Sequence, residues 1–340
     1  MTSALEVSRI NHEDIIMAIA FSPDGRYFAT AGMDTTARVW RVTSGLEVSR
    51  INHEDIIMAI AFSPDGRYFA TASEDSTAQV SEVATGRRVA CLTHEDGVNN
   101  VAFSPDGEYL VTVSGSKVFP QSVNTSSTAI MWEIATGRKV MYITHDYGVN
   151  AFSFSSNGKY LAVASSDHTV GVWEKAIVRR DPSAWEWKVN ASLAVAQMTH
   201  DYPIVAVTFS PDEQYLATAS LDGTARVWEV ISGGEIARMT HDQEINGIGF
   251  SPDGKYLATA SDDHTARVWE IISAQEIARV IHNDKVNAVA FSPDGKLLAT
   301  ASGDLMSGGQ DNNAHLWLWQ PDDFLITKAS SQANPLSLQS

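Results

Sequence analysis

Short runs in which apolar and polar side chains alternate occur along almost the whole chain, and turn residues separate them. In the segment that begins at His241, the runs YLAT (256–259) and ARVW (266–269) have a period near two. β-branched and aromatic residues recur in such runs, which is typical of strands, whereas a helix would need apolar spacings of three and four. The pattern predicts four short strands in this segment.

The same order of strands and turns occurs seven times. The first two copies share 27 identical residues, Leu5–Ala31 and Leu46–Ala72. Periods of about 40–45 residues are typical of solenoids and propellers, and a single small sheet cannot bury both of its faces. We therefore predict an all-β fold: a seven-bladed β-propeller of four-stranded antiparallel blades over residues 1–320, followed by a partly disordered tail over residues 321–340. A histidine opens each copy, and successive histidines lie 41 to 55 residues apart: His12, His53, His94, His145, His200, His241 and His282.

A tight turn follows the first strand of each copy. Its usual sequence, Ser-Pro-Asp-Gly, suits a turn because proline presets φ, aspartate bonds to nearby backbone and glycine accepts a positive φ. Copy four has Ser156-Asn157 within this turn, and copy five has Glu213.

The ring can close in two ways. Residues 5–10 duplicate the strand that precedes the second histidine, so they can supply the outer strand of the seventh blade. Residues 324–329 follow Trp317 at nearly the distance at which 276–280 follow Trp269. We expect the N-terminal segment to form this terminal strand clasp, which removes an open sheet edge; the C-terminal segment is the alternative.

Charge and composition exclude several classes of function. The 41 acidic and 24 basic residues give a net charge of −17, which disfavours nucleic-acid binding because phosphates require Lys and Arg. The chain has no apolar run of roughly 18–20 residues and no signal-like N-terminus, so we expect a cytoplasmic, monomeric protein without membrane contact. Cys91, the only cysteine, excludes an internal disulfide and is expected to be buried in a strand.

Histidine, aspartate and hydroxyl groups in each copy could suggest a nucleophilic triad. An enzyme needs one such constellation, however, whereas this one recurs with fixed spacing, which indicates a structural role. We therefore predict no catalytic residues, no cofactor and no metal site. The aspartate lies six residues before the tryptophan in five copies: Asp34 and Trp40, Asp167 and Trp173, Asp222 and Trp228, Asp263 and Trp269, Asp311 and Trp317.

At these residues the chain resembles the WD-repeat β-propeller family over roughly residues 5–319, and its ending at 317–323 looks like the bacterial type. The resemblance implies hydrogen-bonded sets in which histidine, aspartate and tryptophan share a strand hydroxyl. That hydroxyl is Thr218 or Ser220 in copy five and Thr259 or Ser261 in copy six. Ser81 replaces the tryptophan of copy two, and Ser126 the aspartate of copy three, so we expect these two blades to be the softest. The sets join each aspartate and tryptophan above to His12, His145, His200, His241 or His282.

The resemblance also implies that partners bind on the face that carries the histidine and aspartate loops. Blades one and two place isoleucine and methionine on this face where other copies use asparagine, and exposed apolar clusters often mark interaction surfaces. Packing against the neighbouring blade is the alternative explanation. The candidate partner-binding residues are Ile15, Met17, Met33, Ile56, Met58, Tyr147, Tyr202, Val205 and Leu221.

Three functions remain open at this level. The first is a non-enzymatic scaffold that binds a protein or peptide on this face. The second is the sensor portion of a bacterial signalling ATPase or kinase system, although the chain itself has no Gly-rich phosphate loop. The third, less supported, is a propeller enzyme with a site in the central channel. Insertions at 116–124 and 304–309 lengthen loops on the proposed binding face, and 174–191 lengthens one on the opposite face.

Overall fold

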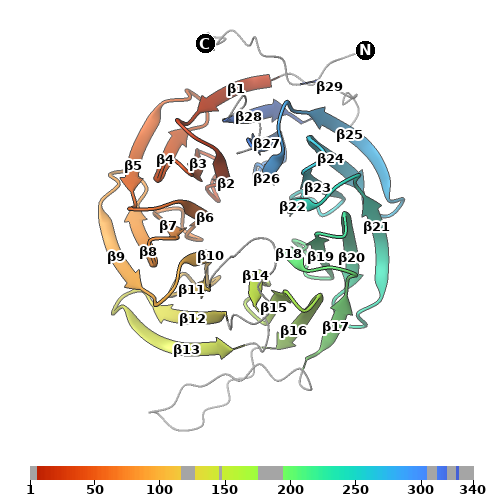
Figure 1. Ribbon diagram of the computed structural model, residues 1–340, viewed down its shortest axis with the longest axis horizontal. Helices are drawn as coiled ribbons and strands as arrows, with labels where there is room; N and C mark the ends of the chain where they lie inside the picture. The colour runs from red at the N-terminus through yellow and green to blue at the C-terminus, as the bar shows by residue number, and fades with distance from the viewer. Residues whose placement is uncertain are drawn as a thin grey trace.

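The chain forms a closed ring of seven blades, with the first strand of each blade nearest the centre (Figure 1). The computed structural model describes residues 6–115, 127–144, 148–174, 194–304, 312–319 and 327–328. These residues form strands and turns, and no helix among them is long and apolar enough to cross a membrane. The all-β, seven-bladed prediction is therefore confirmed. His145, Tyr147, Asp311, Ser126 and most of the three insertions lie outside the described residues.

Each blade contains four antiparallel strands, numbered from the centre outward. Blade one contains β2 (Ile16–Phe21), β3 (Tyr27–Gly32), β4 (Thr36–Arg41) and β5 (Glu47–Asn52). Blade two contains β6 (Ile57–Phe62), β7 (Tyr68–Ser73), β8 (Thr77–Glu82) and β9 (Arg88–Thr93). Blade three contains β10 (Val98–Phe103), β11 (Tyr109–Ser114), β12 (Thr128–Glu133) and β13 (Arg138–Thr144). Blade four contains β14 (Val149–Phe154), β15 (Tyr160–Ser165), β16 (Thr169–Glu174) and β17 (Ala196–Thr199).

The remaining blades repeat this order. Blade five contains β18 (Ile204–Phe209), β19 (Tyr215–Ser220), β20 (Thr224–Glu229) and β21 (Glu235–Thr240). Blade six contains β22 (Ile245–Phe250), β23 (Tyr256–Ser261), β24 (Thr265–Glu270) and β25 (Gln275–Ile281), and β29 (Thr327–Lys328) adds to its outer edge. Blade seven contains β26 (Val286–Phe291), β27 (Leu297–Ser302), β28 (Asn313–Leu318) and β1 (Glu6–Asn11).

The N-terminal strand closes the ring. β1 pairs antiparallel with β28, with Ile10 opposite Ala314 and Arg9 opposite His315. Ile10 is buried, and the Glu6 carboxylate lies 2.9 Å from Nδ1 of the buried His315. The C-terminal β29 pairs in parallel with β25 instead, in blade six. The predicted N-terminal clasp is thus confirmed, and the C-terminal alternative is not adopted.

The hydrophobic core lies between the blades rather than at the centre of the ring. Seven apolar clusters each join neighbouring blades; one of them packs Ala70 and Val80 of blade two against Leu110 of blade three. The inner strands of neighbouring blades pack against each other at ordinary van der Waals distances. A Cβ added at Gly247 of blade six would lie 3.5 Å from Cα of Ala288 in blade seven. Cys91 is exposed on β9, so the expectation that it is buried is wrong.

The two turns that depart from Ser-Pro-Asp-Gly contact each other. In the other turns the glycine lies beside the proline of the preceding blade, as Gly254 does beside Pro211. In blade five, Glu213 replaces the glycine and adopts φ 62°, a region that residues with a Cβ disfavour. Its carboxylate accepts hydrogen bonds from Ser156 Oγ and Asn157 Nδ2, and from the Asn157 backbone N–H at 2.6 Å. The substitutions in blades four and five are therefore complementary.

We expect Glu213→Gly and Ser156→Pro to be non-additive in their effect on stability. Ser156→Pro alone removes a hydrogen-bond donor to Glu213, and Glu213→Gly alone removes the acceptor of Ser156 and Asn157. The double variant restores the glycine–proline contact of the other blades. The coupling free energy should be about 1 kcal/mol, as for other residues in direct contact. Urea unfolding of the four proteins measures it, and additive effects would show that the two turns are independent.

Candidate functional site

The repeated histidine and aspartate form a closed hydrogen-bond network inside each complete blade. In blade six, His241 Nδ1 lies 2.8 Å from Asp263 Oδ2, and its Nε2 lies 2.7 Å from Thr259 Oγ1. Trp269 Nε1 donates to the same Thr259 hydroxyl at 2.9 Å. The His241 side chain has no exposed surface. Both ring nitrogens, the hydroxyl and the indole N–H are therefore satisfied within the blade.

Blades one and five repeat this geometry. His12 lies 2.9 Å from Asp34 and 2.6 Å from Thr30. His200 lies 3.0 Å from Asp222 and 2.7 Å from Thr218. In both blades the tryptophan, Trp40 or Trp228, donates to the threonine at 2.9 Å.

The threonine, and not the serine two residues later, is the shared hydroxyl. Ser220 and Ser261 instead accept the backbone N–H of Asp222 and Asp263, each at 3.1 Å. Threonine and serine lie two residues apart on one strand, so both point to the same face and the sequence could not separate them.

An arginine in three blades is an additional member of the network. Arg38, Arg226 and Arg267 place Nη2 at 2.8, 3.3 and 2.5 Å from Oδ2 of the blade's aspartate. The repeated ARVW sequence in these blades was a signal that sequence reasoning left unused.

The carboxyl groups of these sets remain ionised. Burial raises the pKa of Asp34, Asp222 and Asp263, but hydrogen bonds from histidine and threonine outweigh it and hold each pKa well below its usual range. Burial lowers the pKa of His241 despite the neighbouring Asp263. At neutral pH the pair is therefore a carboxylate bonded to a neutral imidazole. The Thr259 hydroxyl is buried and shared by His241 and Trp269.

The chain's repeats match a known family. The model for "WD domain, G-beta repeat" matches residues 5–41, 46–80, 86–119, 138–174, 193–229, 234–270 and 276–317. The chain belongs to the WD40 repeat family. No curated protein was found to match it. The seven matched segments agree with the seven WD40 repeats read from the sequence, whereas their bacterial type stays a prediction.

Two WD40 blades lack part of the network. In blade two, His53 still lies 2.7 Å from Asp75 and 2.8 Å from Thr71, and Ser81 occupies the tryptophan position. The sequence analysis did not identify Asp75, because it located each aspartate by counting six residues back from a tryptophan and blade two has Ser81 there. The Ser81 hydroxyl is buried and has no hydrogen-bond partner among the described residues. These findings agree with soft blades, although softness itself stays a prediction.

Blade three holds a histidine that lacks its usual acceptor. His94 Nε2 lies 2.7 Å from Thr112 Oγ1, and Trp132 donates to that hydroxyl at 2.8 Å. His94 Nδ1 is buried and unbonded within the described part of the chain. Burial, with a smaller contribution from Lys139, lowers the pKa of His94 to about 4.

We expect this histidine to make the WD40 ring sensitive to acid. In the unfolded chain its pKa is about 6.5, so the unfolded state binds a proton that the folded state resists. The stabilisation is complete above pH 6.5 and is lost as pH falls towards about 4. Melting temperatures measured across this window should fall less steeply in His94→Gln than in the unchanged protein. Identical slopes would mean that His94 does not titrate in this way.

Blades four and seven are only partly described. In blade four, Asp167 accepts the backbone N–H and the hydroxyl of Thr169 at 3.0 and 2.7 Å. In blade seven, Trp317 donates to Thr300 at 2.9 Å, while His282 Nδ1 lies 3.1 Å from Ser302 Oγ. Trp173 and Trp317 are both buried. His145 and Asp311, predicted to complete these sets, lie outside the described residues.

The candidate partner-binding residues differ in exposure. Met17, Met33, Ile56, Met58, Val205 and Leu221 are each partly exposed. Tyr202 is 59% exposed and stacks on His168 with ring centroids 6.1 Å apart. Ile15 is only 3% exposed because its side chain packs against Gly303 of blade seven. The expectation that Ile15 is exposed is therefore wrong.

Every blade has a β-bulge at the start of its inner strand, at the position that Met17, Met58 and Val205 occupy in blades one, two and five. Where the inner strand pairs with the second strand, the register shifts between its first and third residues. The residue between them, which is the fifth after each histidine, therefore has no partner in the strand pairing. Bulges redirect side chains out of the sheet. Asn150, Asn246 and Asn287 use this position to donate to a carbonyl of the next blade, at Ile204, Val286 and Ile16. Met17 and Met58 carry no such donor.

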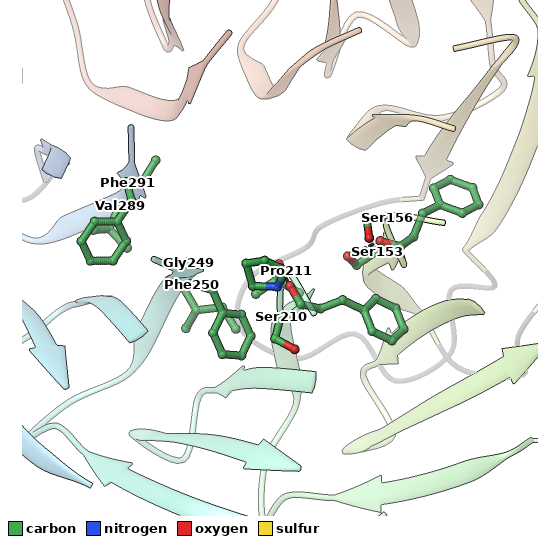
Figure 2. A pocket seen from close by; sticks show the side chains of 13 residues that line it. Ser153, Ser156, Ser210, Pro211, Gly249, Phe250, Val289 and Phe291 are labelled. Atoms are coloured by element: carbon green, nitrogen blue, oxygen red, sulfur yellow. Dashed lines mark hydrogen bonds between the residues drawn. The ribbon is translucent and has the colours of Figure 1, made fainter. Parts of the chain in front are cut away.

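A hollow lies on the opposite face of the ring, at the ends of the inner strands of blades four to seven (Figure 2). Its volume is about 360 Å³, and the residues that line it include Ser153, Gly249 and Phe291. Among the described residues that line it, none carries a carboxylate or an imidazole.

Proposed function

We propose that the protein is a non-enzymatic scaffold that binds a protein or peptide on the face of the histidine and aspartate loops. The observation that carries this proposal is the pair Met17 and Met58. At the bulge, three other blades use asparagine to bond to the next blade, whereas these two adjacent blades present partly exposed methionine side chains. Methionine is flexible and adapts to varied partners.

Two further features support a binding function. The groups that could perform chemistry are buried and bonded to one another, as in the His241 set. Ile56 and Met33, in the loops of the same two blades, are also partly exposed. A role as the sensor portion of a larger bacterial signalling system stays a prediction from the sequence.

The double variant Met17→Asn/Met58→Asn tests this proposal. We expect affinity capture with mass spectrometry to lose the partner that the unchanged protein retains. The melting temperature should stay the same or rise, because each asparagine can donate to the next blade as Asn287 does to Ile16 O at 3.2 Å.

The matched control is Ile231→Asn/Ile272→Asn. These isoleucines are 65% and 94% exposed in turns between the third and fourth strands, at the opposite end of the blades. The control should keep the partner. Retention of the partner by the methionine variant, or a large loss of stability in it, would favour packing over binding.

A further inference from the structure

Acidic side chains gather in the histidine and aspartate loops of the ring. The described parts of these loops contain a single Lys or Arg, Lys285, and its Nζ lies 2.5 Å from Asp262. In blades one to three, six loop carboxylates form no ion pair with any described residue: Glu13, Asp14, Glu54, Asp55, Glu95 and Asp96. The exposed Glu244 of blade six and the buried Asp284 of blade seven also form none.

The charge is better balanced at the opposite face. There, three turn aspartates each lie near a basic side chain of the same turn: Asp24 lies 3.6 Å from Arg26, Asp253 lies 3.9 Å from Lys255 and Asp294 lies 3.5 Å from Lys296. In blades five and six, the exposed Asp201 and Asp242 lie 3.6 and 3.5 Å from the buried guanidinium groups of Arg226 and Arg267. The exposed loop carboxylates without an ion pair among the described residues therefore lie mainly in blades one to three, with Glu244 of blade six as the exception.

The apolar patch lies within this acidic region. Glu13 and Asp14 precede Met17 in blade one, and Glu54 and Asp55 precede Ile56 and Met58 in blade two. The loops are held in shape, because Asp14 and Asp55 each accept the next backbone N–H at 2.7 Å. A partner here would meet apolar side chains surrounded by carboxylates.

An aromatic ring on the same face adds an independent feature. The Tyr202 ring is 59% exposed, stacks on His168 of the neighbouring blade and follows Asp201, whose side chain is 83% exposed. Aromatic faces attract Lys and Arg.

From these features we propose that the partner is a segment of another protein rich in Lys or Arg that also carries apolar side chains. Its apolar side chains pack on Met17, Ile56 and Met58, and its basic side chains meet Glu13, Asp14, Glu54 and Asp55. Charge complementarity of this kind sets partner choice and association rate. The inference rests on the proposed function, since it specifies the partner of that same face.

Three synthetic peptides of equal length test it by fluorescence anisotropy against the full chain. One combines lysine with leucine, one replaces each lysine by glutamate, and one replaces each leucine by serine. We expect the lysine–leucine peptide to bind most tightly and to weaken as salt rises, because exposed charges are screened. The glutamate peptide should not bind.

Two matched variants locate the site. Glu13→Gln/Asp14→Asn/Glu54→Gln/Asp55→Asn removes four charges from the face and keeps the side-chain acceptors. Glu108→Gln/Glu174→Gln/Glu229→Gln/Glu270→Gln removes four exposed charges elsewhere. The variant at positions 13, 14, 54 and 55 should weaken binding of the lysine–leucine peptide about tenfold, because each exposed ion pair contributes about a few tenths of a kcal/mol. The variant at positions 108, 174, 229 and 270 should change this binding little.

Each outcome decides between specific and general attraction. Equal weakening by both charge variants, or equal binding of the lysine–serine peptide, would show that net charge alone attracts the peptide and would overturn the inference. Tight binding of the glutamate peptide that Met17→Asn/Met58→Asn abolishes would also overturn it, yet would uphold the proposed function. Failure of the lysine–leucine peptide to bind contradicts the inference, whereas the proposed function fails only if the methionine variant keeps its captured partner.

Discussion

Deletion of residues 1–11 is expected to destabilise the whole ring by on the order of 5 kcal/mol, a large part of the roughly 5–15 kcal/mol that stabilises a typical domain. The deletion removes β1, so β28 becomes an open edge. It exposes the site of Ile10, which is 4% exposed, and burial of such a side chain contributes about 1.5–3 kcal/mol. It also removes the Glu6 carboxylate from the buried His315.

Deletion of residues 320–340 is the control for this prediction. Of that segment, the structure describes only Thr327 and Lys328, which pair with the outer edge of blade six, a blade that already has its four strands. Thermal unfolding of both truncated proteins should show a much larger fall for the N-terminal deletion. A larger fall for the C-terminal deletion would reverse the assignment of the clasp.

Asp263→Ala is the point substitution with the largest expected effect on stability. It would leave His241 Nδ1 and the Arg267 guanidinium buried without their shared carboxylate. Removing one partner of a buried ion pair typically costs about 3–5 kcal/mol, because the remaining charge stays desolvated. Asp242 and Glu276, each 3.5 Å from Arg267, would offset part of this cost. Denaturant unfolding should therefore show a much lower midpoint.

Two other aspartates calibrate this effect. Asp242→Ala changes a side chain that is 90% exposed and should alter stability by well under about 1 kcal/mol. Asp75→Ala in blade two should cost less than Asp263→Ala, because Gln79 and Ser81 stand where blade six has Arg267 and Trp269. Equal effects at positions 242 and 263 would show that the network does not stabilise the ring.

The repeat period and the strand alternation were enough to predict the fold, because each unit must bury its faces against its neighbours. The clasp was also predictable, since residues 5–10 copy the strand that precedes His53. The contact between Glu213 and Asn157 was not, because the sequence shows two unusual turns without showing that they meet.

The binding face was less predictable, because exposure depends on the neighbouring blade. Ile15 and Ile56 lie in identical 27-residue passages, yet Ile15 is buried and Ile56 is partly exposed. Ile15 packs against Gly303, at the junction where the ring closes. The role of the arginine was missed because only three copies carry it, and that of Asp75 because Ser81 stands in place of tryptophan.

Site-specific photo-crosslinking tests most directly whether the apolar face of blades one and two binds the partner. A photoreactive residue would be placed at position 56, on that face, and separately at position 272, where Ile272 is 94% exposed in a turn at the other end of blade six. The account predicts a crosslinked partner from position 56 and none from position 272. Crosslinking from position 272 alone would contradict it.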